Sequence, residues 1–164
     1  FFFKQKTAYE ITRWLEFRRV LFRSKETSIR ASLDYLLLQN GGFIPTDSIS
    51  MLLGDKVCEL SEINNLFITI YDLNGRYLVS MNTDTAEAHK IPMQLSPELT
   101  QQITTTTKKR AIILPSETNS SQNLAYWCFS DDYGRPLALV GMLYEKKEVE
   151  KEIGRAHVWT PVTL

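Results

Sequence analysis

The sequence predicts an α+β domain of two layers, in which a five-stranded antiparallel sheet has N-terminal helices and one short helix packed on one face. Two observations support this fold class. Apolar residues recur with the helical period of about 3.6 as far as Leu60, and with the strand period of 2 from Leu66 onward. The expected strands are joined mostly by hairpins, which favours an antiparallel sheet with one face covered by helices.

Two helices are expected ahead of the strands. In Lys25–Asn40 the apolar residues form one helical stripe, and Gly41-Gly42 ends the helix. A second helix begins after Pro45, where Asp47 or Thr46 is placed to cap it. The apolar residues expected on the buried sides are Ile29, Leu33, Leu36 and Leu37 in the first helix and Ile49, Leu52, Leu53, Val57 and Leu60 in the second.

The firmest strand prediction is the segment "LFITIYDLNGRYLVS", which indicates strand, turn and strand. Asn74-Gly75 between two such runs is a hairpin signal, because both residues tolerate positive φ. Ser96-Pro97 is typical of an N-cap and the first residue of a short helix. Three further strands are expected at Arg110–Pro115, Asn123–Ser130 and Pro136–Glu145, followed by a charged, helix-forming exit segment at Lys146–Glu152.

The two ends of the chain resemble translated adapter from a short-read sequencing library. The matching stretches are "KQKTAYEI" and "LEFRRVLFRS" at one end and "EIGRAHVWTPVT" at the other. Trp14 and Trp159 fall where such an adapter carries TGA, a codon that some genetic codes translate as Trp. Processing artefacts are excluded from fold reasoning. We therefore interpret residues 1–24 and 153–164 as adapter-derived and residues 25–152 as the domain; the alternative is a genuine basic, amphipathic N-terminus.

This division changes what the charge implies. The whole chain has 19 basic and 19 acidic residues, but the two ends hold seven Lys/Arg and two Asp/Glu. Residues 25–152 therefore keep 12 basic and 17 acidic residues, a net charge of −5. Nucleic-acid binding depends on clustered Lys and Arg that neutralise phosphates, so a nucleic-acid partner is not expected.

Length and composition set further bounds. The 128 residues from 25 to 152 suit one domain with a core of its own. They contain no apolar run long enough to span a membrane. The two cysteines, Cys58 and Cys128, are expected to be buried free thiols; a disulfide between them would require an oxidising compartment. No zinc-ligand spacing is present, so neither a metal nor a cofactor is expected.

The domain resembles the extracytoplasmic sensor domains of bacterial sensor histidine kinases, of the PAS-like type called Cache, in particular those of Bacteroidetes-type bacteria. The resemblance covers nearly all of residues 25–152 and lies in "SIRASLDYLLLQNGG", "ITIYDLNGRYLVS" and "YWCFSDDYGRPLALVGMLYEKKEV". Asp72, Gly75 and Leu78 fit the D-x-x-G-x-x-L pattern of the first hairpin in that family. The D-x-x-G-x-P-L pattern of the last hairpin is matched by Asp132 (or Asp131), Gly134, Pro136 and Leu137.

The resemblance implies a periplasmic domain of an inner-membrane protein that senses a small molecule or an envelope signal. The chain has no phosphoacceptor-histidine helix and no ATP-binding boxes, so it would be the input end of a kinase only. Candidate ligand-binding residues are Tyr71, Arg110, Tyr126 and Trp127. The first three offer polar tips to a polar or anionic ligand, and Tyr126 and Trp127 alternate between the two faces of their strand. The alternative is that the aromatic residues fill the core and that Arg110 is exposed.

No enzyme activity is expected for this segment. His89 lies in a polar loop, no G-x-S-x-G motif surrounds a serine, and Asp131-Asp132 is more typical of a turn than of a metal or catalytic pair. Other readings of the same fold are the input domain of a chemotaxis receptor or a diguanylate cyclase, and a ligand-free PAS-like or longin-like interaction module. A homodimer through the helix Lys25–Asn40 is also expected, because its stripe would continue a membrane helix.

Overall fold

A computed structural model describes residues 2–80, 91–106, 111–115 and 122–145. Its five strands form one antiparallel sheet in the order β2-β1-β5-β4-β3, which confirms the α+β class and the strand count predicted from the sequence. The elements are α1 (Phe2–Gln39), the short 3-10 helix η1 (Thr46–Ser48), α2 (Ile49–Asn64), β1 (Phe67–Tyr71), β2 (Tyr77–Ser80), α3 (Pro97–Thr105), β3 (Ile112–Pro115), β4 (Gln122–Ser130) and β5 (Pro136–Glu145).

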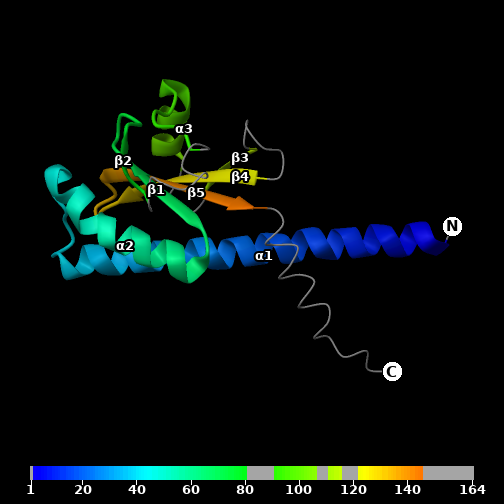
Figure 1. Cartoon of the computed structure of the whole chain (residues 1–164). Coiled ribbons are helices and arrows are strands. Elements are labelled where there is room, and N and C mark those ends of the chain that lie inside the picture. Colours follow the sequence, from blue (N-terminus) through cyan, green and yellow to red (C-terminus); the bar gives the residue numbers. More distant parts are fainter. Residues whose placement is uncertain (1, 81–90, 107–110, 116–121, 146–164) are drawn as a thin grey trace.

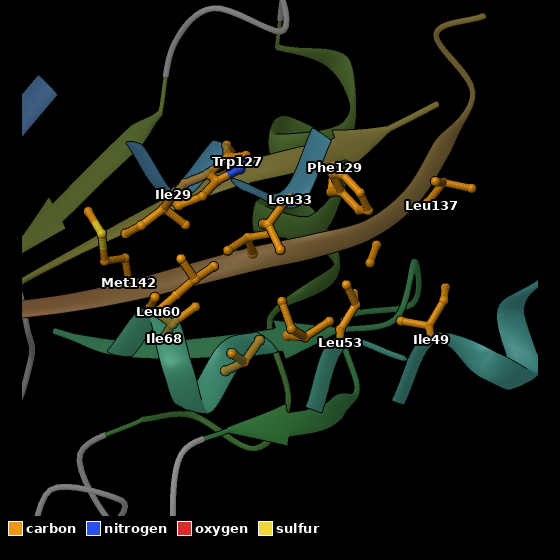
Figure 2. Packing of buried hydrophobic residues seen from close by; sticks show 14 of the residues in the cluster. Ile29, Leu33, Ile49, Leu53, Leu60, Ile68, Trp127, Phe129, Leu137 and Met142 are labelled. Atoms are coloured by element: carbon orange, nitrogen blue, oxygen red, sulfur yellow. The ribbon is translucent and has the colours of Figure 1, made fainter. Parts of the chain in front are cut away.

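Helices α1 and α2 lie against one face of the sheet (Figure 1). Ile29, Leu33 and Leu37 of α1 are buried there, while Leu36 is half-buried. Figure 2 shows Ile29 and Leu33 beside Trp127 of β4, and Leu53 and Leu60 of α2 near β1. Because every fourth residue of α1 faces the sheet, the predicted helical stripe is confirmed.

The opposite face of the sheet is also covered, and this differs from the prediction that all helices share one face. A second core joins Phe67 and Tyr71 of β1 to Ile103 of α3, Tyr126 of β4 and Leu139 of β5. All five residues of β1 are buried, as in a strand with packing on both sides. The expectation that all helices share one face was wrong because β1, whose residues are mostly apolar, has no exposed face, which is typical of a strand buried on both sides.

Local chain geometry agrees with the turn residues in most places. Gly41 and Gly42 both adopt positive φ, and the Gly42 amide donates to the Leu37 carbonyl at 2.9 Å, which closes α1. The expected side-chain cap on the second helix is absent: Thr46 and Asp47 lie in η1, and α2 starts after Ser48 without a side-chain cap hydrogen bond.

Helix α1 is longer than the predicted Lys25–Asn40 helix and extends past the sheet toward the N-terminus (Figure 1). Glu10, Thr12, Arg13 and Ser24 are exposed. The division of the chain at residues 24 and 152 stays a prediction, and the exit segment Lys146–Glu152 lies outside the described residues.

Candidate functional site

The candidate site is a row of three residues that lie in register across the sheet on the α3 side. Thr69 of β1 pairs with Gly141 of β5, and Gly141 pairs with Tyr126 of β4. Tyr71, two residues after Thr69, lies on the same face, because side chains alternate along a strand. We call Thr69, Tyr71, Tyr126 and Gly141 the tyrosine cluster.

Gly141 lets the two tyrosine rings approach the strand. A Cβ atom at this position would lie 3.0 Å from Tyr71 Cε2 and 3.1 Å from Tyr126 Cε1. The ring centroids are 6.3 Å apart at an interplanar angle of 58°, a tilted arrangement that aromatic pairs favour. Glycine inside a strand commonly marks such a close approach, and here the approaching groups are the two predicted site residues.

Thr69 places a buried hydroxyl group in this cluster. Its side chain is 1% exposed, and its Oγ1 has no hydrogen-bond partner. A buried hydroxyl without a partner is unfavourable by about 1–3 kcal/mol, so native structures rarely keep one without a role or a missing partner. This atom is the feature that distinguishes the cluster from an ordinary aromatic core.

The hydroxyl groups of the cluster are neutral hydrogen-bonding groups at physiological pH. Tyr71 donates from its hydroxyl to the Pro92 carbonyl at 2.9 Å, which attaches the segment after residue 90 to the sheet. Burial, with smaller contributions from the nearby Tyr126 and Tyr77, raises the pKa of Tyr71 far above its ordinary value. Burial also raises the pKa of Tyr126 to about 12. Neither phenol therefore serves as an acid or base near neutral pH.

Trp127, the other candidate ligand-binding residue in β4, does not belong to this cluster. It follows Tyr126 in β4 and therefore points to the opposite face, where it is buried against α1. The Arg30 guanidinium lies 4.9 Å from the centroid of the Trp127 ring. Arg30 Nε also donates to Glu26 Oε1 at 2.7 Å, one helical turn away on α1.

The remaining predicted site residue, Arg110, lies outside the described residues, as does His89. Sequence reasoning missed Thr69 and Gly141. Both had a signal: Thr69 is the one polar residue in an otherwise apolar strand, and Gly141 interrupts the apolar run of β5. Neither signal indicates which face of the sheet the residue occupies, so only the strand register brings them together.

The aspartates of the two hairpins have a structural role. The loops "DLNGR" and "DDYGR" adopt the same turn: the amides of Asp72 and Asp131 donate to the carbonyl four residues later, and Gly75 and Gly134 have positive φ. Asn74 does not adopt positive φ, so each turn is a type I turn with a glycine bulge in place of the expected Asn-Gly type. Asp131, and not Asp132, is the equivalent of Asp72 in the second turn.

Asp131 stabilises its turn by bonding to the backbone. Its Oδ1 accepts from the Tyr133 and Arg135 amides at 3.0 and 2.8 Å, and its Oδ2 accepts from Arg135 Nε at 2.9 Å. Burial raises the pKa of this carboxyl, but the hydrogen bonds and the positive charge of Arg135 outweigh burial, so the pKa of Asp131 is lowered. The expectation of a turn in place of a metal or catalytic pair is consistent with these contacts.

Three other features complete the description of the site. Among the described residues, no group of His, Cys, Asp and Glu has a metal-binding arrangement. Cys58 is exposed and Cys128 is half-buried, so the expectation of two buried thiols was wrong for Cys58 and holds only in part for Cys128. Within the part of the chain that the structure describes, no helix is long and apolar enough to cross a bilayer.

Comparisons with known proteins give structural similarity but no family match. No protein-family model and no curated protein matches the chain. Among solved structures, the chain is similar to the sensory domain of the Campylobacter jejuni chemoreceptor CcmL with isoleucine bound. The TM-score is 0.47 and the sequence identity is 15%, over 91% of this chain and 65% of that chain. This chain therefore corresponds to less than two thirds of that chain's length.

Proposed function

We propose that residues 25–152 form the extracytoplasmic sensor domain of a membrane-bound bacterial sensor histidine kinase. The observation that carries this proposal is the tyrosine cluster: a buried hydroxyl without a hydrogen-bond partner, next to a glycine that admits two buried tyrosines. The cluster lies on the sheet face opposite α1. In this proposal the domain receives a ligand on the face of the tyrosine cluster and presents α1 on the other face.

The chemistry of the cluster indicates the ligand class. The core on this side is built from aromatic and aliphatic residues, and the buried charged residues among those described, Glu26 and Asp131, lie in α1 and in the turn after β4. A ligand charge buried among the aromatic and aliphatic residues would lack a partner, which is strongly unfavourable. We therefore propose a small, uncharged polar molecule that donates to or accepts from Thr69 Oγ1. The earlier expectation of an anionic ligand depends on Arg110 and stays a prediction.

Binding would act by population shift. A ligand changes the balance of two conformations only as far as its affinity for them differs. Gly141 leaves no free space beside the rings, because even a methyl group there would lie about 3 Å from both. A ligand that occupies this position must therefore displace Tyr71 or Tyr126, and so favours a conformation that differs from the one described here.

The kinase assignment, the periplasmic location and the homodimer are parts of the same proposal. A helix that enters from a first membrane span and a strand that continues into a second would connect the domain to a kinase core, and two copies of α1 would pair along their axis. Tyr35 and Leu38, which are 59% and 66% exposed on α1, offer apolar contacts for such a pair. Sedimentation of the chain as a monomer at high concentration would contradict the pairing.

The second candidate keeps the fold and changes the output. An input domain of a chemotaxis receptor or a diguanylate cyclase would have the same ligand face, and a ligand-free PAS-like or longin-like interaction module would have neither a ligand nor flanking spans. The sequence of the parent gene after Glu152 separates the first two from the kinase. Absence of a hydrophobic span on both sides of residues 25–152 in that gene would refute every membrane-bound version.

The parent gene also tests our interpretation of the ends. If residues 1–24 and 153–164 are adapter-derived, the genomic reading frame diverges from this chain at both borders. A genomic frame that encodes the "LEFRRVLFRS" stretch would show that the N-terminal half of α1 is native.

Binding itself is tested on the chain as it stands. The full chain is screened against small uncharged metabolites by thermal shift, with Thr69→Val as the matched variant. Compounds that raise the melting temperature of the unchanged protein and have a weaker effect on Thr69→Val support the proposal. Compounds that stabilise both proteins equally would place the binding site elsewhere.

A further inference from the structure

We propose that Arg30, stacked on Trp127 and held by Glu26, fixes the axial register of α1 on the sheet and couples α1 to the tyrosine cluster through β4. This inference goes beyond ligand sensing, since the register argument holds with no ligand bound. Its use as a signalling contact rests on the proposed function.

The apolar contacts of α1 define its register only in part. Ile29, Leu33 and Leu37 are spaced by four residues, and all three are buried. A slide of α1 by one turn, about 5.4 Å, keeps an apolar residue at two of the three buried positions and brings Lys25 or Gly41 to the third. Apolar burial is non-directional, so at the other two positions the apolar residues do not distinguish the original register from the shifted one.

The charged row on the neighbouring side of α1 removes this ambiguity. It reads Glu26, Arg30 and Asp34, again at a spacing of four residues. In the observed register the Arg30 guanidinium lies over the Trp127 ring at 4.9 Å, a favourable position for a cation. A slide of one turn in either direction would bring the carboxylate of Glu26 or Asp34 over the ring, whose face is negative. The row therefore selects one register.

Glu26 makes this contact more specific. It is a buried carboxylate, and its Oε1 accepts from Arg30 Nε at 2.7 Å and lies 2.6 Å from Arg30 Nη2. An ion pair at such a site is seldom more stabilising than well-packed apolar residues, and its best-attested use is to specify register. The pair holds the guanidinium in place above the indole, so the stack does not depend on a freely rotating side chain.

Two consecutive residues of β4, Tyr126 and Trp127, contact the two opposite faces of the domain core. Tyr126 packs against Gly141 and Tyr71 on the α3 side, and the next residue, Trp127, packs against Arg30 on the α1 side. A displacement of the Tyr126 ring that moves β4 also moves Trp127. A change at the tyrosine cluster is thus transmitted to the contact that sets the position of α1.

The register is tested in the full chain with Cys58→Ser and Cys128→Ser, which removes both native thiols. Spin labels at Leu38→Cys on α1 and Ile113→Cys on β3, both exposed sites, report the distance between helix and sheet. We expect Arg30→Met to add a second distance, displaced by up to about 5 Å, the length of one helical turn. The matched Arg30→Lys, which keeps the cation, retains the single distance. An unchanged single distance in Arg30→Met would overturn the proposal.

The coupling is tested without a ligand, so that a failed ligand search does not affect it. Trp14→Phe and Trp159→Phe leave Trp127 as the sole tryptophan, because the chain has three. Gly141→Ala pushes the tyrosine rings outward, and we expect it to shift the Trp127 emission. Gly54→Ala, whose new Cβ would meet only Val79 at 3.9 Å, leaves the emission unchanged. If Gly141→Ala alters the near-ultraviolet signal of the tyrosines but not the Trp127 emission, the two faces are not coupled.

Discussion

Replacing Thr69 by Val tests whether the tyrosine cluster contains a hydroxyl without a partner. The two side chains have nearly the same shape, so the substitution exchanges the hydroxyl for a methyl group with little change in packing. Thr69 is 1% exposed and its Oγ1 accepts and donates no hydrogen bond, so the folded protein gains by losing the group. The penalty removed is about 1–3 kcal/mol. We therefore expect Thr69→Val to be more stable than the unchanged protein.

The same substitution at Thr100 is the matched control. Thr100 is also β-branched and is 9% exposed, but its Oγ1 donates to the Ser96 carbonyl at 2.9 Å. Thr100→Val loses this hydrogen bond, which destabilises the protein by about 0.5–1.5 kcal/mol. The two variants should therefore change stability in opposite directions.

Urea denaturation, with melting temperature as a second measurement, is sufficient to separate the two variants. For a chain of this size, 1 kcal/mol shifts the melting temperature by about 2–4 °C. If Thr69→Val is destabilised as much as Thr100→Val, the Thr69 hydroxyl is satisfied in solution. The reasoning that makes it a ligand contact would then be wrong.

The remaining predictions concern the turns and the titration of a buried phenol. Asp131→Asn lowers the melting temperature at neutral pH, and the deficit shrinks as the pH falls below about 4, because a lowered pKa contributes stability only above that range; a deficit that persists in acid would contradict this. Gly75→Ala and Gly41→Ala both place a side chain at positive φ, which destabilises by roughly 1–2 kcal/mol. At Gly75 the new Cβ would also lie 2.6 Å from Thr100 Oγ1, whereas at Gly41 it would meet no atom within 4 Å. Urea denaturation should therefore show a larger loss of stability for Gly75→Ala, and equal losses would show that this close contact has no effect. The pKa of about 12 for Tyr126 makes stability fall as the pH rises from about 10 toward 12, and Tyr126→Phe should reduce that slope in pH-dependent unfolding.

Local sequence signals predicted the elements well. The strand Pro136–Glu145 and the short helix after Ser96 occur as expected, and the Ser96 hydroxyl accepts from the Leu99 amide as an N-cap. These features depend on residues within a few positions of one another. The β4 strand begins at Gln122, one residue before its predicted start, within the usual uncertainty of strand ends.

Features that depend on long-range pairing were harder to predict. The alternation of Tyr126 and Trp127 showed that they point to opposite faces, but not that both faces are buried. That follows from where α1 and α3 pack, which sequence periodicity does not reveal. The meeting of Thr69, Gly141 and Tyr126 likewise depends on the register of three strands, of which β1 and β5 are separated by more than half of the domain.

The most direct test of a sensing role is the amide NMR spectrum of the full chain, recorded with each small uncharged compound that raises its melting temperature. We predict that at least one compound shifts the amides of Thr69, Tyr126 and Gly141, and that Thr69→Val weakens its binding by about two- to tenfold, the equivalent of one hydrogen bond. If every such compound leaves these three amides unshifted, the tyrosine cluster is a packed core and the sensor proposal loses its site.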